Sequence, residues 1–143
     1  MLFQIKAKKP SIILSQSEAA RLEPLAFRLE LIDSNAGAFL LAEIYRAEIR
    51  GDDQVPADVV RMHSEVTFVE ERQGTPHTIC LVYPDEVDIT RQQVSVLTPI
   101  GAALIGLSKG QSIACPSGDG IERWVRVVRV HNGAGDPPPV PAA

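Results

Sequence analysis

The spacing of apolar residues changes from a helical period to a strand period near residue 51, and this change constrains the fold more than any other feature. Before it, apolar side chains recur at steps of three and four, which places them on one face of a helix. After it, they tend to alternate at every second position, as in strands with one buried face. A chain with helices first and strands afterwards is expected to form an α+β fold.

A first helix is predicted from apolar residues that recur at helical steps over residues 19–32, after a short apolar run at residues 11–14 that is a strand or an anchoring segment. Ser15 and Glu18 have the spacing of a capping box, which marks a helix start. Pro24 lies inside the helical pattern and has no N–H to donate, so a kink or a late start of the helix is expected there.

A second helix is predicted over residues 38–50, after a turn at residues 33–37. Two amphipathic helices joined by a short loop bury their apolar stripes on each other, so residues 1–50 are expected to form a short antiparallel hairpin. Residues 51–57 are interpreted as a linker.

Residues 58–131 are predicted to form an antiparallel β domain with one short helix. Gly74 to Pro76 is expected to connect a β-hairpin, and the single helix is expected over residues 99–107, with proline at its start. Residues 132–143 are rich in proline and are expected to be a disordered tail. The predicted strands of the whole chain are residues 11–14, 59–62, 65–71, 78–83, 94–97, 111–115 and 121–130.

Charge and cysteine content limit the function and the compartment. The net charge is −4, with seven basic and six acidic residues before residue 51 and seven basic and twelve acidic after it. An acidic β domain disfavours nucleic acid as the primary ligand, since phosphate binding needs clustered lysine and arginine. Cys80 and Cys115 lie in separate segments, so no disulfide framework is expected. We expect a cytoplasmic, monomeric protein with no membrane segment and no sequence-specific DNA binding.

The polar residues form no pattern typical of catalysis. The three histidines are scattered, so no metal site is predicted, and no phosphate-binding glycine loop or activated nucleophile is present. The acidic cluster at residues 85–88 is interpreted as a solvated turn rather than an ion site. Arg123, Arg126 and Arg129 are expected on both faces of one strand, which weakens any basic stripe. The residues indicate a binding protein without a cofactor rather than an enzyme.

Residues 94–106, VSVLTPIGAALIG, resemble the signature of the C-terminal domain of the GreA/GreB transcription elongation factors. Residues 84–88, PDEVD, look like the segment that commonly precedes this signature. Residues 58–64, DVVRMHS, are similar to the corresponding motif of the Rnk branch, the regulators of nucleoside diphosphate kinase. The resemblance covers roughly residues 11–130.

The resemblance implies an FKBP-like domain that docks on RNA polymerase near its secondary channel, with the hairpin pointing toward the channel. The implied docking residues are Leu97, Thr98, Pro99, Ile100 and Gly101. A helix start fixed by Thr98-Pro99 can receive polar groups of a partner. The alternative, that Pro99 and Gly101 only start and pack the helix, stays open, and both can hold together. Leu97 stands where Gre proteins usually carry Asp or Asn.

The predicted hairpin tip, Asp33, Ser34 and Asn35, departs from the Gre pattern. Gre factors promote transcript cleavage with an Asp-x-x-Glu pair that helps hold a metal ion. In this chain Asp33 matches the Asp, but Ala36 stands at the position of the Glu. A lone carboxylate cannot clamp a hard cation as a pair can. We therefore expect a competitor of Gre-type factors that does not stimulate cleavage.

Two other functions remain open at this point. An FKBP-like fold suggests a peptide-binding protein or a peptidyl-prolyl isomerase, but the β domain offers only Phe68, Tyr83 and Trp124 as material for an aromatic pocket. The name of the Rnk branch suggests control of nucleoside diphosphate kinase, for which an indirect effect through transcription is the simpler account.

Overall fold

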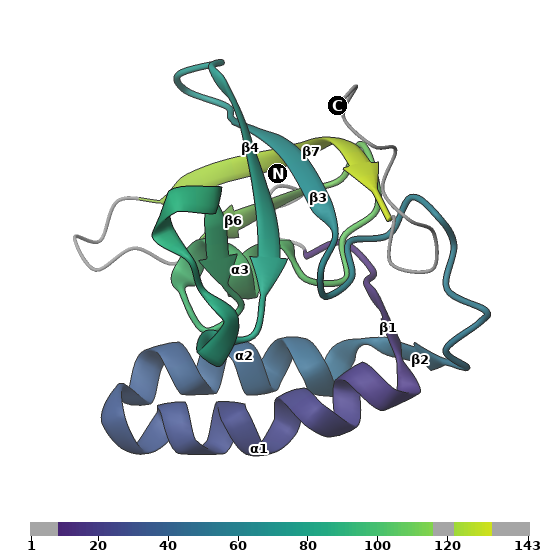
Figure 1. Ribbon diagram of the computed structural model, residues 1–143, viewed down its shortest axis with the longest axis vertical. Coiled ribbons are helices and arrows are strands. Elements are labelled where there is room, and N and C mark those ends of the chain that lie inside the picture. The colour runs from purple at the N-terminus through teal and green to yellow at the C-terminus, as the bar shows by residue number, and fades with distance from the viewer. Residues whose placement is uncertain (1–8, 116–121, 133–143) are drawn as a thin grey trace, which may run out of the picture.

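A computed structural model of the chain describes residues 9–115 and 122–132 (Figure 1). The predicted turn at residues 116–120 and nearly all of the Pro-rich tail lie outside the described residues. The elements are β1 (Ile13–Ser15), α1 (Gln16–Ile32), α2 (Ser34–Arg46), β2 (Glu48–Arg50), β3 (Glu65–Glu70), β4 (Pro76–Val82), the 3-10 turns η2 (Pro84–Glu86) and η3 (Ile89–Arg91), β5 (Gln93–Ser95), α3 (Pro99–Leu104), β6 (Ser112–Cys115) and β7 (Arg123–His131).

The helical hairpin is confirmed, but its connection is a single residue. The turn predicted at 33–37 is wrong, because α2 already begins at Ser34. Asp33 ends α1 by donating its N–H to the Leu29 carbonyl oxygen at 2.7 Å, and it caps α2 by accepting the Ala36 N–H on its Oδ1 at 3.1 Å. One aspartate therefore replaces the expected loop, since it satisfies backbone groups of both helix ends.

The first helix begins where the spacing of Ser15 and Glu18 predicted, which confirms that start. Ser15 is the N-cap residue, and its Oγ accepts the Glu18 N–H at 3.1 Å. In a complete capping box, the Glu18 side chain would accept a hydrogen bond from the Ser15 N–H. Here the Glu18 carboxylate accepts hydrogen bonds from Arg61 and Met62 instead. Pro24 lies well inside α1, so the helix continues through it rather than starting late.

Residues 48–50 form a strand instead of the end of the second helix, which corrects the predicted range 38–50. After Ala47 turns the backbone into an extended conformation, β2 pairs in parallel with β1, with Ile13 opposite Glu48. The pairing satisfies backbone groups at the open end of the hairpin, where the Glu48 N–H also donates to the Ile12 carbonyl at 2.9 Å.

The second sheet has five strands in the order β5-β4-β3-β7-β6, and all pairs except β4–β5 are antiparallel. A mostly antiparallel sheet with one short helix is therefore confirmed, with element ends shifted by one to three residues. The strand predicted at residues 59–62 is wrong: Val59 makes only one bridge, to Ser108. His63 then adopts a positive φ of 70°, which ends the extended run.

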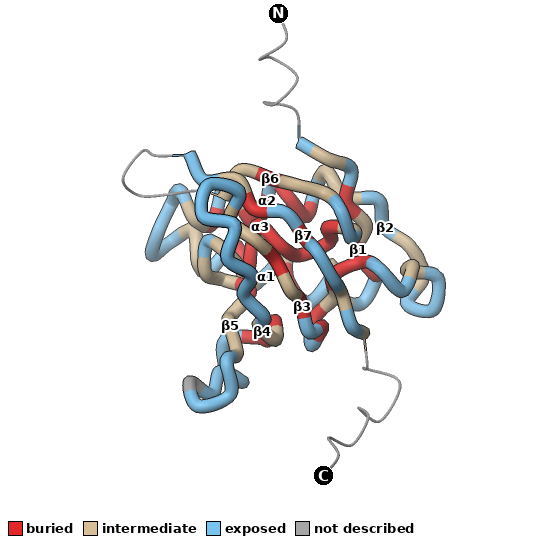
Figure 2. The backbone as a smooth tube through the Cα atoms, turned by 90° about the horizontal axis from the view of Figure 1, so that it is seen from above, coloured by how far each residue is buried: buried red, intermediate tan, exposed pale blue. Residues whose placement is uncertain are grey.

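One apolar core joins the hairpin, α3 and the sheet (Figure 2). It contains Leu22 and Leu40 from the hairpin, Leu104 from α3, and Leu81 and Val127 from the sheet, all fully buried. The hairpin thus lies along the body of the molecule, with α1 on the side away from the sheet (Figure 1). Within the described ranges, no helix combines the length and apolar character that a bilayer crossing requires. The division of the chain into modules stays a prediction.

Candidate partner-docking site

The corner that leads into α3 is fixed by its own hydrogen bonds. The Thr98 Oγ1 accepts the Gly101 N–H at 3.1 Å and donates to the Ser95 carbonyl oxygen at 2.7 Å. The Ser95 hydroxyl accepts the Leu97 N–H at 3.0 Å. Pro99 occupies the first helical turn, where its missing N–H costs nothing. The corner is rigid because both its backbone and its cap are tied to β5.

Gly101 is required by a close approach of two backbone segments. A Cβ at this position would lie 2.2 Å from the Ser95 carbonyl oxygen and 2.9 Å from the Val96 Cα. Neither atom belongs to a side chain that can move aside. Pro99 and Gly101 therefore both have structural roles in starting and packing α3, and these roles do not depend on a partner.

The five implied docking residues differ in how much surface they offer. Pro99 is exposed, Leu97, Thr98 and Ile100 are half-buried, and Gly101 is buried. Leu97 and Ile100 also pack against the core. The Gly101 N–H donates to Thr98 Oγ1, and the Ala102 N–H donates to the Thr98 carbonyl oxygen at 2.8 Å. Because these donors are used within the chain, the surface presented here is mainly apolar and centred on Pro99.

The predicted tip residues Asp33, Ser34 and Asn35 lie together at the end of the hairpin, all exposed. The Asp33 carboxylate is committed to capping α2 through the Ala36 N–H. The next acid along α1, Glu30, lies one turn below the tip, where its backbone packs against Gly37. No cluster of three potential metal-ligating side chains occurs among residues 9–115 and 122–132.

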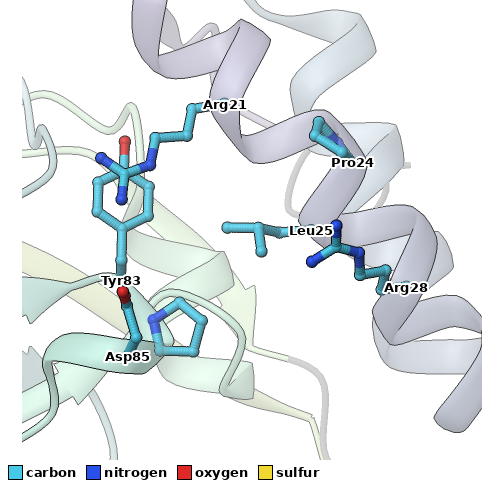
Figure 3. A pocket seen from close by; sticks show the side chains of 7 residues that line it. Arg21, Pro24, Leu25, Arg28, Tyr83 and Asp85 are labelled. Atoms are coloured by element: carbon cyan, nitrogen blue, oxygen red, sulfur yellow. The ribbon is translucent and has the colours of Figure 1, made fainter.

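A groove of about 620 Å³ separates α1 from the segment that follows β4 (Figure 3). The Arg21 guanidinium lies over the Tyr83 ring, 3.7 Å from its centre, and Leu25 points into the space between the two walls (Figure 3). The sequence did not indicate this groove, because its walls come from segments some sixty positions apart. It is lined by Arg21, Pro24, Leu25, Arg28, Tyr83, Pro84 and Asp85.

The acidic segment after Tyr83 is a hydrogen-bonded turn. Glu86 accepts the Tyr83 N–H at 3.0 Å, and its carboxylate lies 2.8 Å from His63 Nε2. Burial, the largest single influence, would raise the pKa of Glu86, but these two hydrogen bonds and the nearby charges of His63 and Arg21 together outweigh it and hold that pKa below its ordinary value. The Glu86 carboxylate thus stabilises the turn after Tyr83 and also binds the side chain of His63, the residue with positive φ.

The segment of residues 58–64 joins the hairpin to the sheet. Glu18 of α1 receives a hydrogen bond from Arg61 Nε at 3.2 Å and one from the Met62 N–H at 3.4 Å. Burial raises the pKa of the Glu18 carboxyl, and the charge of Arg61 opposes that rise only in part. Ser64 donates to Asn132, so the segment is also tied to the end of β7. Sequence spacing alone did not reveal this joint.

A buried carboxylate anchors the segment that precedes β1. Glu43 of α2 is fully buried and pairs with Arg46 at 2.7 Å and with Lys9 at 2.9 Å. Arg46 also donates to the Pro10 carbonyl oxygen. A buried charge needs partners of this kind because its desolvation is costly.

The three aromatic residues considered for a prolyl-binding pocket do not share one cavity. Phe68 lines a shallow groove with His77 and Ile79, whereas Tyr83 lines the groove beside α1. Trp124, half-buried, donates its indole N–H to Glu122 at 3.1 Å. The described residues therefore give no support to the isomerase alternative.

The fold is that of a known class of transcription factors. The family model described as "Transcription elongation factor, GreA/GreB, C-term" matches residues 55–132, and the chain belongs to this family. Within it, the chain is similar along nearly its full length to the branch called regulator of nucleoside diphosphate kinase. The protein of that name from Escherichia coli strain K12 is 32% identical over 131 residues, which span 90% of this chain and 96% of that protein.

Two further relatives agree with this placement. The transcription elongation factor GreA of Azorhizobium caulinodans is 29% identical over 119 residues, covering 78% of this chain and 76% of that protein. A solved structure of a prokaryotic GreA/GreB transcription elongation factor from Nitrosomonas europaea is 38% identical, with a TM-score of 0.67, and covers 87% of this chain and 100% of that one. The mixed fold of two helices and a mostly antiparallel sheet is therefore shared with the family.

Proposed function

We propose that this chain is a transcription regulator that binds RNA polymerase near its secondary channel and competes there with Gre-type elongation factors. Membership of the GreA/GreB family is the observation that carries the proposal. The rigid corner before α3 supports it, because a surface that is already ordered loses little conformational entropy on binding. A cytoplasmic location, where polymerase works, is part of the same proposal.

The proposed docking contact is centred on the exposed Pro99 ring, with the half-buried side chains of Leu97 and Ile100 at its edges. This contact is apolar, in keeping with leucine at the place where Gre proteins usually carry Asp or Asn. Thr98 and Gly101 shape the corner through the hydrogen bond that caps α3. They act on the partner through backbone position rather than through charge.

Stimulation of transcript cleavage is not part of the proposed function. The only carboxylate at the tip, Asp33, caps α2, and Ala36 stands where the second acid would be. The arm is also short, because 17 residues of α1 span only about 25 Å at ~1.5 Å per residue. A lone acid on a short arm cannot hold a metal ion in a distant active site. An effect on nucleoside diphosphate kinase, the subject of the relative's name, is proposed to be indirect.

The test is binding to purified core polymerase in competition with a labelled Gre factor. Wild-type chain is expected to displace the label, and Pro99→Glu is expected to weaken displacement by at least ~10-fold while leaving the fold intact, since glutamate suits the first turn of a helix. Pro76→Glu is the matched control, because Pro76 is an exposed proline at the start of β4, outside the corner.

Three results would count against the proposal. Failure of the wild-type chain to bind polymerase would remove it entirely. Equal displacement by the Pro99 and Pro76 variants would move the contact to another surface. Faster cleavage in a backtracked complex on adding the wild-type chain would contradict the reasoning about the tip.

A further inference from the structure

Helix α1 carries two apolar stripes, and only one of them is buried. Leu22 and Ala26 face the core. On the opposite side, Ala20, Pro24, Phe27 and Leu31 follow one another at steps of four, three and four. All four are exposed: 47% of Phe27 and 88% of Leu31 is accessible to solvent. We call these four residues the outer stripe; in Figure 1 they belong to the helix on the side away from the sheet.

Charged residues flank the outer stripe with opposite signs on its two sides. Arg21 and Arg28 each follow a stripe residue by one position, and Glu23 and Glu30 each precede one. Steps of four and three with charges at these flanking places form the pattern of a two-helix coiled coil, in which the flanks set the partner and its orientation.

The signs select one way of pairing two copies of this helix. In a parallel pair related by a two-fold axis, each acidic flank meets the basic flank of the other helix. Glu23 of one copy then faces Arg28 of the second copy, five positions further on, and the contact occurs twice. In an antiparallel pair, basic flanks would meet each other and so would acidic flanks. The sequence of α1 is therefore complementary to itself in the parallel arrangement.

We propose that the outer stripe is a self-association surface, which pairs two copies of this chain in parallel through α1. Among residues 9–115 and 122–132, Arg28 forms no ion pair within its own chain, whereas Arg21 is stacked on Tyr83. Glu23 accepts a hydrogen bond from the exposed Tyr45 hydroxyl at 2.7 Å, and a carboxylate has room for a further donor. Glu23 and Arg28 therefore each keep hydrogen-bonding capacity for a group on a second copy.

The pairing is weak and depends on concentration. Two heptads are too short to hold a coiled coil between free peptides, but α1 is already ordered by its packing on α2 and the core, so pairing does not have to fold it. One face of a helix about 25 Å long makes an interface at the small end of the known range. We expect a dissociation constant on the order of 10–100 µM. This proposal departs from the monomer expected from the sequence, and it does not depend on polymerase binding.

Sedimentation of the full chain over a range of concentrations tests the proposal. The wild-type mass is expected to rise from that of the 15.5 kDa monomer toward twice that value. Glu23→Arg and Arg28→Glu should each weaken association by about 10-fold or more, because each places like charges opposite one another. An equal mixture of the two variants should associate again, since each then offers the charge that the other lacks. In an antiparallel pair, either single change would relieve repulsion between like charges and would therefore strengthen association.

Two neutral substitutions at the end of α1 provide a matched comparison. Leu31 and Ile32 are 88% and 87% exposed, but only Leu31 belongs to the outer stripe. Leu31→Gln should abolish association, and Ile32→Gln should leave it unchanged. A wild-type chain that stays monomeric at ~1 mM would overturn the proposal. Equal effects of the two glutamine variants would also overturn it. If the wild-type chain is monomeric and Leu31→Gln loses polymerase binding, the outer stripe is a contact surface for polymerase instead.

Discussion

Gly37→Ala tests the close contact between the two helices. A Cβ at residue 37 would lie 2.3 Å from both the Cα and the backbone nitrogen of Glu30. Non-bonded carbon atoms are stable at about 3.5 Å or more, so the helices would have to separate there by roughly 1.2 Å. The one-residue connection at Asp33 leaves little slack for that movement. Side chains packed between the helices, such as Leu22 and Leu40, would lose part of their contact.

The magnitude follows from two opposing effects. Overpacking that moves a backbone costs about 3 kcal/mol, at the upper end of the usual range. Alanine is a better helix former than glycine by about 1 kcal/mol, which offsets part of that loss. We expect a net loss of about 2 kcal/mol in the free energy of unfolding. For a chain of 143 residues this lowers Tm by roughly 4–8 °C.

Thermal and urea unfolding followed by far-UV circular dichroism measures the effect. Gly51→Ala is the matched control, because a Cβ there would meet its nearest atom, Asp53 Oδ1, at 3.4 Å. That variant should lie within about 0.5 kcal/mol of wild type. A Gly37→Ala chain as stable as wild type, or more stable, would refute the close helix contact and the reasoning built on it.

Three further changes test other contacts. Arg46→Met leaves the fully buried Glu43 with only Lys9, so stability should fall by about 3–5 kcal/mol in urea unfolding; Arg50→Met, which removes the exposed pair with Glu48, should change little. Asp33→Ala removes the α2 cap and should lower stability by about 1 kcal/mol, while Ser34→Ala should not. Burial raises the pKa of Glu18 above its ordinary 4.5, so the stability that its protonation adds is present below that pH and is lost as pH rises through the raised value. The stability of wild type minus that of Glu18→Gln should therefore fall across this window, and a difference that grows with pH would contradict the assignment.

The sequence predicted the order and type of most elements because apolar periodicity reports which face of an element is buried. It misplaced the hairpin connection, since Asp33, Ser34 and Asn35 are common both in turns and at helix caps. Gly37 was interpreted as part of the turn, although its role is to let two helices touch. Local pattern cannot tell these roles apart, because the contact that decides between them comes from another segment.

The site was less predictable than the fold. The family signature located the α3 corner, and the cap by Thr98 could be expected from threonine before proline. The joint between Glu18 and Arg61 could not, because it links positions 43 apart in the chain. The bulge in β7 was also missed: Thr67 pairs with Arg129 but Phe68 pairs with Val127, so the regular alternation of faces is broken between Val127 and Arg129.

The single residue between α1 and α2 limits how this arm can change length. Adding one residue to either helix would turn everything beyond it by about 100°, and no flexible loop is present to absorb the rotation. A longer hairpin of the same kind therefore requires matched insertions of about seven residues in both helices, which restore each face after two turns. Reach toward a partner can thus be lengthened only in steps of roughly 10 Å.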